Sequence, residues 1–233
     1  MEKLDNTKVI RNISFDQKEI LYNIMQLHND GKPFEADMTA SSLGFYKQNK
    51  NDEYNIPEPK ILMDVFPQRE DIIKIEPYKP LPLEDNSVES IVCDLPFVVS
   101  PQNAPSCAKK EKGSNIIFNR FYSFYPATDM FKQYKFWIDE LFRVLKPNGI
   151  CVFKTQSTVS GGLQWQTSEF SFMCAVNAGF YPLDKFILEA KARLISGKIK
   201  SQKHARRFTS DFWVFKKDDK RAKKIDYFGY LDR

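Results

Sequence analysis

The alternation of apolar strand-like and helix-like segments between residues 88 and 217 most constrains the fold. Four segments rich in Ile, Val and Phe have strand length, at 90–94, 150–156, 184–190 and 210–217. Helical spacing of apolar residues fills 129–147, which Pro147 and Gly149 should stop, and 167–179, which should end at Gly179. Strands this apolar are typical of a mainly parallel sheet with helices on both faces. The last two strands lack a helix between them, which predicts an antiparallel hairpin at the sheet edge.

The first half of the chain is less regular. We predict a helix over residues 14–31, with Ser14 as its N-cap and Gly31 as its stop, and two short strands at 60–66 and 71–77. Residues 98–125 read as a long irregular loop, a kind of segment that is usually functional or mobile. One α/β domain is expected over residues 1–233, with 1–13 and 218–233 peripheral.

Composition excludes several classes of protein. The chain has 9 glycines and no GxGxxG or GxxxxGK[ST] pattern, which argues against the usual dinucleotide and nucleoside-triphosphate loops. Cys93, Cys107, Cys151 and Cys174 show no CxxC spacing, so we expect buried free thiols and no metal site. No run of 18 apolar residues and no secretory h-region occurs, which predicts a cytoplasmic protein outside the membrane.

Charge is distributed unevenly along the chain. Residues 191–224 hold 13 Lys and Arg against 3 Asp, a net of +10, so the remaining residues carry −5 of the total +5. A basic segment on an acidic body points to a phosphate-rich partner, and a merely solubilising face is the alternative.

The densest chemical signal is Asp94-Leu95-Pro96-Phe97, directly after the predicted strand 90–94. Ligands of open α/β sheets bind just beyond the carboxyl ends of the strands, where this tetrapeptide would lie. An acid followed by proline is also an ordinary strand terminator, so position alone leaves both interpretations open.

The surrounding segments add to this signal. LPLEDNSVESIVCDLPF (81–97), a long loop, ELFRVLKPNG (140–149) and the strand ICVFK follow one another. This order resembles the class I S-adenosylmethionine-dependent methyltransferases, and among them the DNA amino-methyltransferases with a [DNS]-P-P-[YF] motif. RVLKPNG matches their LKPGG turn, residues 178–193 resemble a late strand, and 202–217 resemble the closing hairpin. The resemblance covers about residues 73–217.

The resemblance implies roles for the tetrapeptide. The Asp94 carboxylate and the Leu95 carbonyl would accept hydrogen bonds from an exocyclic amine, Pro96 would stiffen the turn, and Phe97 would stack on the base. Family members usually have proline where Leu95 stands. The family flips its target base out of the stack, and a set of loop aromatics would line or close over that base, or else simply cover the sheet. These aromatics are Phe118, Phe121, Tyr122, Phe124 and Tyr125.

The implied cofactor is S-adenosylmethionine. The family's Gly-rich turn has no GxGxG counterpart here, and the best candidate is FEADMTASSLGFYK (34–47), without a clear crossover helix after it. Asp37 would meet the methionine amino group and Asp64 the ribose, with Glu76 as a weaker choice. Ser41, Ser42, Gly44 and Tyr46 would shape the pocket. Each acid could equally be a surface turn residue.

The resemblance also implies that the basic loop between the last two predicted strands, residues 191–210, would lie on the active-site side and contact nucleic-acid phosphates. Its candidate residues are Lys198, Lys200, Lys203, His204, Arg206 and Arg207.

We therefore expect methyl transfer to a nucleobase amine, with adenine N6 in DNA as the leading target. Cytosine N4 and RNA are the variants, and a non-catalytic nucleic-acid-binding protein with the same fold is the rival. The small size leaves little room for a separate target-recognition domain. Recognition of the target sequence would therefore come from the loops 98–125 and 191–210, from a recognition subunit or from a homo-oligomer.

Overall fold

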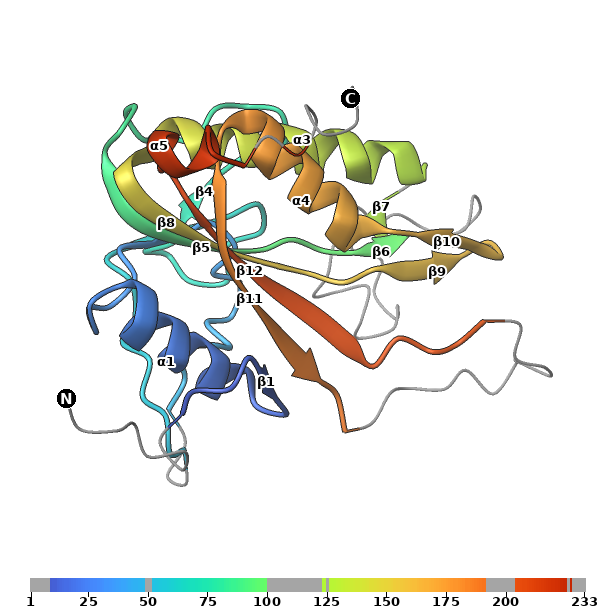
Figure 1. Ribbon diagram of the computed structural model, residues 1–233, viewed down its shortest axis with the longest axis horizontal. Coiled ribbons are helices and arrows are strands. Elements are labelled where there is room, and N and C mark those ends of the chain that lie inside the picture. The colour runs from blue at the N-terminus through green and yellow to red at the C-terminus, as the bar shows by residue number, and fades with distance from the viewer. Residues whose placement is uncertain are drawn as a thin grey trace.

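The computed structural model describes residues 9–48, 52–99, 123–124, 126–191, 204–225 and 227. A twisted eight-stranded sheet runs through the centre of the molecule (Figure 1). In spatial order its strands are β1 (Ile13–Ser14), β11 (Tyr181–Glu189), β12 (Thr209–Lys216), β8 (Leu145–Thr155), β5 (Val88–Asp94), β2 (Ala36–Asp37), β3 (Ile61–Asp64) and β4 (Ile73–Lys74).

Strand direction confirms the predicted α/β class. β12 pairs antiparallel with both β11 and β8, and the other recorded pairs of this sheet are parallel. The predicted hairpin is therefore β11–β12, but β12 lies inside the sheet and not at its edge. The outer edge of β11 is covered by β1, where Ile13 pairs with Ile187. The sequence prediction missed β1 because two residues carry no periodicity.

Helices cover both faces of the sheet. In Figure 1, α3 (Ala127–Val144) and α4 (Thr167–Ala178) lie above the sheet, and α1 (Gln17–His28) lies below it. A one-turn helix, α5 (Asp219–Ala222), follows β12. Two small ribbons complete the described part, β6 (Val98–Val99) with β7 (Ser123–Phe124), and β9 (Thr158–Ser160) with β10 (Leu163–Trp165).

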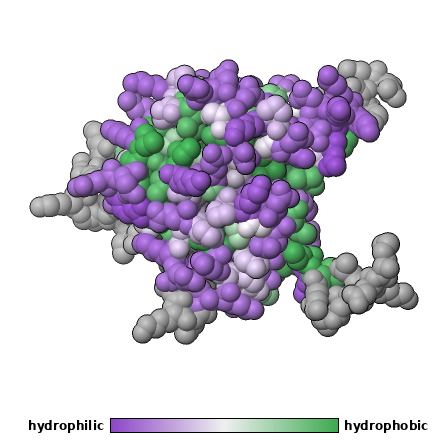
Figure 2. Space-filling model, turned by 90° about the vertical axis from the view of Figure 1, so that its left-hand side faces the viewer, coloured by the Kyte–Doolittle hydropathy of each residue, from purple (hydrophilic) through white to green (hydrophobic). Residues whose placement is uncertain are grey.

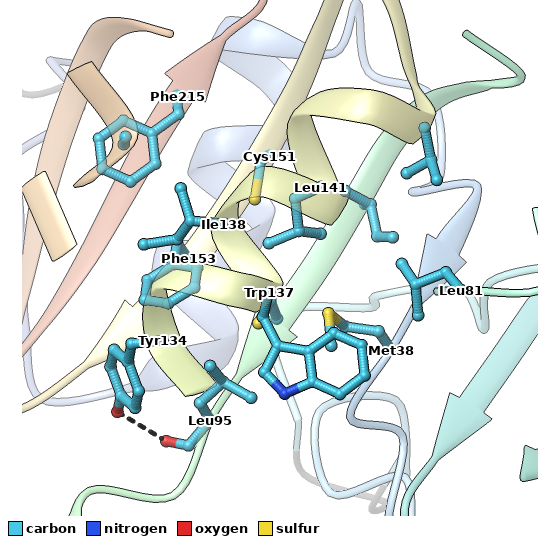
Figure 3. Packing of buried hydrophobic residues seen from close by; sticks show 14 of the residues in the cluster. Met38, Leu81, Leu95, Tyr134, Trp137, Ile138, Leu141, Cys151, Phe153 and Phe215 are labelled. Carbon is cyan, nitrogen blue, oxygen red and sulfur yellow. Dashed lines mark hydrogen bonds between the residues drawn. The ribbon is translucent and has the colours of Figure 1, made fainter. Parts of the chain in front are cut away.

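The core has two halves because neighbouring residues of a strand point to opposite faces. In β8, Cys151 and Phe153 pack under α3 and α4, whereas Ile150 and Val152 pack toward α1. Figure 3 shows the first half, in which Trp137 of α3 lies between Leu95 and Leu81. This double burial explains why strand segments such as 91–93 and 150–153 carry apolar residues at consecutive positions.

Two predicted helix ends are wrong. Asp16, and not Ser14, caps α1, because its carboxylate accepts from the Lys18 N–H at 2.8 Å. α3 stops at Val144, ahead of Pro147, because β8 already begins at Leu145. The predicted stop of α4 is confirmed, since Gly179 caps that helix with φ +105°. The expected strands 60–66 and 71–77 shrink to β3 and β4.

Gly149 in the RVLKPNG turn has no room for a side chain. A Cβ there would lie 2.9 Å from the backbone oxygens of both Glu89 and Lys146. We expect Gly149→Ala to lower the free energy of unfolding by about 1–3 kcal/mol, since backbone atoms would have to shift. Urea unfolding would measure this loss. Gly44→Ala is the control: its Cβ would meet nothing within 4 Å, so its midpoint should stay at the wild-type value. Equal midpoints for the two variants would contradict the prediction.

Cys93, Cys151 and Cys174 are buried free thiols, as predicted, and Cys107 lies outside the described residues. Of the helices in the described ranges, none is long and apolar enough to cross a membrane. Hydrophilic residues cover most of the face in Figure 2, with smaller hydrophobic patches between them.

Candidate active site

The topology singles out one point on the sheet. Five neighbouring parallel strands lie in the spatial order β4-β3-β2-β5-β8. If these five are counted from 1 to 5 along the chain, their spatial order is 3-2-1-4-5, as in a doubly wound sheet. In such a sheet the order reverses between the first and the fourth strand. That reversal falls between β2 and β5. Ligands of such sheets bind in the crevice outside the carboxyl ends of these strands, where β2 ends at Asp37 and β5 at Asp94.

Thr39 joins the two strand ends at this point. Its hydroxyl oxygen accepts the Asp94 backbone N–H at 2.7 Å and donates to Asp37 Oδ1 at 3.1 Å. The Thr39 backbone N–H also donates to Asp37 Oδ1, at 2.7 Å. One short side chain therefore fixes the position of Asp94 relative to Asp37.

The Asp94 carboxylate forms an ion pair with the neighbouring strand. Lys154 of β8 is the register partner of Asp94, and its Nζ lies 2.7 Å from Asp94 Oδ2. The side chains remain 25% exposed for Asp94 and 13% exposed for Lys154, so a ligand can still reach the pair. Sequence reasoning found Asp94 but not Lys154.

Tyr134 of α3 holds the rest of the tetrapeptide. Its buried hydroxyl lies 3.0 Å from the Pro96 carbonyl oxygen and 3.4 Å from that of Leu95, the contact drawn in Figure 3. Leu95 is 5% exposed and packs in the core. Phe97 is half-buried.

Asp37 is closed off from solvent. Its side chain is 0% exposed, and its Oδ2 accepts from the Tyr46 hydroxyl at 2.7 Å. Burial raises the pKa of Asp37 to about 7, and the hydrogen bonds from Tyr46 and Thr39 oppose that rise. The structure brings the two candidate residues Asp37 and Tyr46 into contact, and a ligand reaches the Asp37 carboxylate only if Tyr46 moves aside.

Asp64 lies at the next strand end along the same edge. Its Oδ2 accepts from the Ser41 N–H at 2.7 Å and its Oδ1 from the Phe66 N–H at 2.6 Å. Burial raises the pKa of Asp64, and these two bonds oppose the rise. Ser42 and Gly44 are exposed on the same turn. Glu76, the weaker choice for the ribose, is exposed and pairs with Lys79 at 2.8 Å, which lowers the pKa of its carboxyl.

The turn after β2 adopts left-handed backbone without glycine. Ser41 has φ +45° and Leu43 has φ +60°, a conformation that costs side-chain-bearing residues roughly 1–2 kcal/mol each. Within the described residues between β2 and β3 there is no helix, in line with the sequence reading. Strain of this kind is often retained at ligand sites.

The basic segment is only partly described. Lys198, Lys200 and Lys203 lie outside the described residues. Exposed His204 places Nε2 3.1 Å from the Gly162 carbonyl oxygen, and Arg206 is half-buried. Arg207 lines a hollow of about 100 Å³ with Ser157, Gln166, Glu169, Thr209 and Asp211.

The Arg207 hollow lies beyond the carboxyl end of β8, on the Asp94 edge of the sheet. Arg207 Nε is buried there without a hydrogen-bond partner among the described residues.

Of the loop aromatics, only Phe124 is described. It is 2% exposed, and its ring centroid lies 6.4 Å from that of Tyr134, so it covers the sheet and does not line a pocket. Phe118, Phe121, Tyr122 and Tyr125 lie outside the described residues.

Three residues of the site were not predicted: Thr39, Tyr134 and Lys154. One signal was readable for Tyr134, since a tyrosine at a core position of a helix needs a partner for its hydroxyl. The other two act through strand register and gave no local signal.

Comparisons with known proteins add distant matches only. No protein-family model matches the chain, and no curated protein matches it. A protein from Thermus thermophilus, provisionally described as a DNA modification methylase and solved with S-adenosyl-L-methionine, is 14% identical. The match covers 59% of this chain and 50% of that one, with a TM-score of 0.39.

Two further solved structures are similar at the same level. The PvuII DNA methyltransferase, cytosine-N4-specific, is 13% identical over 59% of this chain and 45% of its own, with a TM-score of 0.43. A SAM-dependent methyltransferase from Methanosarcina mazei is 10% identical over 78% and 80%, with a TM-score of 0.38. The chain thus spans about half the length of the Thermus and PvuII proteins. At TM-scores below 0.5, the site's own geometry has to carry the functional argument.

Proposed function

We propose that this chain is an S-adenosylmethionine-dependent methyltransferase that acts on an exocyclic amine of a nucleobase, with adenine N6 in DNA as the leading target. One observation carries the proposal: Asp94, at the carboxyl end of β5 beside the strand-order reversal, is fixed by Thr39 and Lys154 while its side chain stays partly exposed. Cytosine N4 and RNA remain the variants.

The two acids fit different parts of the cofactor. Asp64 fits the ribose, whereas Asp37 fits the amino group only under the conditions given below. Asp64, beside the exposed Gly44 turn, suits the hydroxyl groups of a ribose, since its oxygens keep acceptor capacity beyond their two backbone bonds. Asp37 suits a cationic amino group, but only in its ionised form and with Tyr46 displaced. When bound, the cofactor supplies an electrophilic methyl group.

The chain's own residues would position the amine. The Asp94 carboxylate accepts an N–H of the amine, which favours a nitrogen lone pair directed away from the ring. Tyr134 fixes the turn that carries the Leu95 and Pro96 carbonyls, and Phe97 offers a face for stacking. Positioning and electrostatics would therefore supply most of the rate.

The Arg207 hollow supports a nucleic-acid substrate. A guanidinium whose buried Nε has no hydrogen-bond partner in the described part of the chain, on the same sheet edge as Asp94, suits a phosphate oxygen. DNA of any sequence would present such a group next to a flipped base.

A second function has an observation of its own. The Tyr46 hydroxyl on buried Asp37 favours a non-catalytic nucleic-acid-binding protein whose cofactor crevice has closed. Titration calorimetry with S-adenosylmethionine separates the two functions, because the binding protein would give no heat of binding.

The test of activity uses labelled S-adenosylmethionine with DNA and RNA, followed by digestion to nucleosides. Label in N6-methyladenine from DNA is the expected result, and label in N4-methylcytosine or in RNA nucleosides would select the variants. Nucleic-acid binding with no heat of binding for S-adenosylmethionine and no label in any nucleoside would overturn the enzyme in favour of the binding protein.

A further inference from the structure

The ion pair at the centre of the site has unused hydrogen-bonding capacity. A lysine ammonium carries three N–H donors. Among the described residues, Asp94 is the sole hydrogen-bond acceptor for Lys154 Nζ, although the lysine side chain is only 13% exposed. Donors this enclosed are usually paired.

The rest of the ammonium faces aromatic rings. Lys154 Nζ lies 5.2 Å from the ring centroid of Phe45 and 5.6 Å from that of Phe212. These faces hold the cation in place by electrostatic attraction. Ring faces take up little of the hydrogen-bonding capacity, so an N–H remains for a ligand seated beside Asp94.

Asp94 and Lys154 thus present an acceptor and a donor side by side, with 2.7 Å between Oδ2 and Nζ. Adenine and cytosine each carry the complementary pair, an amine N–H next to an unprotonated ring nitrogen. On its Watson–Crick edge, guanine has a ring N–H beside its amine, which would face the lysine donor with another donor; its unprotonated N3 lies on the other side of the amine. Uracil and thymine have no amine.

On the basis of the proposed function, we propose that Lys154 is a specificity-determining residue that donates to the ring nitrogen beside the target amine while Asp94 accepts from the amine. The pair reads the Watson–Crick edge of a flipped base and rejects guanine presented on that edge, because such binding would leave two donors unpaired. Phe45 belongs to the turn after β2, so the base-reading cation also contacts the proposed cofactor turn.

The test replaces one ring nitrogen of the base by C–H and removes one charge from the protein. Oligonucleotides carry adenine, 1-deazaadenine or 7-deazaadenine at the target, opposite an abasic site so that base pairing contributes nothing. For the wild type we expect 1-deazaadenine to lower kcat/KM by about 10- to 100-fold, the effect of one hydrogen bond from a charged donor, and 7-deazaadenine to leave it unchanged. With a cytosine target, 3-deazacytosine replaces 1-deazaadenine.

Lys154→Met should be slower on adenine and should show no further loss on 1-deazaadenine. Lys146→Met is the matched control: Lys146 lies near the other end of β8, 3.3 Å from Glu89, and should behave as wild type. A lysine with a merely structural role would slow both substrates equally. An equal 1-deaza loss in the wild type and Lys154→Met, or no loss in the wild type, would overturn the inference.

Failure of the proposed function is visible separately. If the wild type methylates no base, the same three oligonucleotides are compared by fluorescence anisotropy. Weaker binding of 1-deazaadenine by the wild type, but not by Lys154→Met, would support the contact in a protein without activity. Equal binding of all three oligonucleotides would overturn it.

Discussion

Asp94→Ala should lower methyl transfer by about 100- to 1000-fold, the usual cost of removing one group that stabilises the transition state. The carboxylate lies at the strand-order reversal, and no other described carboxylate is ion-paired to Lys154. The measurement is single-turnover transfer from labelled S-adenosylmethionine at saturating DNA, so that weaker binding does not enter.

Two companion variants separate chemistry from stability. Asp94→Asn keeps an acceptor oxygen, and asparagine occurs at this position in the family motif, so about a tenfold loss is expected. Asp139→Ala removes an exposed acid that pairs with Lys135 on α3 and should leave transfer unchanged. Circular dichroism should show all three variants folded, although Asp94→Ala leaves Lys154 unpaired. Undiminished turnover in folded Asp94→Ala would remove Asp94 from the active site.

The sheet was predictable because its strands are buried on both faces. Residues 91–93 and 150–153 are apolar at every position, which predicted two strands, and the structure pairs these strands as β5 and β8. The short strands β1 and β2 depend on pairing with longer strands, and a two-residue segment has no period to detect. The sequence marked Asp37 as a candidate only because small residues follow this acid.

Glycine content proved a poor guide to the turn after β2. The lack of a GxGxG pattern argued against a phosphate- or cofactor-binding turn, yet Ser41 and Leu43 adopt the left-handed conformation that glycine usually supplies. Glycine adopts the left-handed conformation at the lowest energetic cost, but other residues can adopt it too. A lack of glycine therefore does not exclude a left-handed turn. The neighbouring hydrogen bond from Ser41 to Asp64 helps to hold this conformation.

Lys154 was invisible for a different reason. It lies 60 residues after Asp94 in sequence, and strand register alone brings the two side chains to 2.7 Å. The same holds for Thr39, whose hydroxyl bonds the backbone of a residue 55 positions later. Pairs of this kind need the register of a parallel sheet, which a single sequence does not specify to one residue.

Asp37 should make the protein less stable as the pH rises. Its folded pKa is raised from 3.8 to about 7 by burial, so between these values the folded state holds a proton that the unfolded state has released. The free energy of unfolding therefore falls as pH rises from about 4 to 7, by up to about 4 kcal/mol. Asp37→Asn cannot ionise and should lose this decline.

Urea unfolding at pH 5 and pH 8 measures the effect, with Asp30→Asn as the control because Asp30 is exposed near the end of α1. The wild type and Asp30→Asn should be less stable at pH 8 than at pH 5 by similar amounts, whereas Asp37→Asn should change much less. A parallel decline in Asp37→Asn would show that Asp37 is already ionised in the folded protein at low pH.

The same proton links stability to cofactor binding. A cationic amino group gains an ion pair only with ionised Asp37, so S-adenosylmethionine should bind about 15-fold more tightly at pH 7 than at pH 5.5. Asp37→Asn should bind weakly at both values. In the wild type, the hydrogen bond from the Tyr46 hydroxyl to Asp37 Oδ2 lowers the pKa of Asp37. Tyr46→Phe removes this bond and so raises that pKa. The affinity of Tyr46→Phe for S-adenosylmethionine should therefore rise at a higher pH than that of the wild type. If affinity is independent of pH in the wild type and in Asp37→Asn alike, the buried acid serves the fold alone, and the cofactor's amino group is held elsewhere.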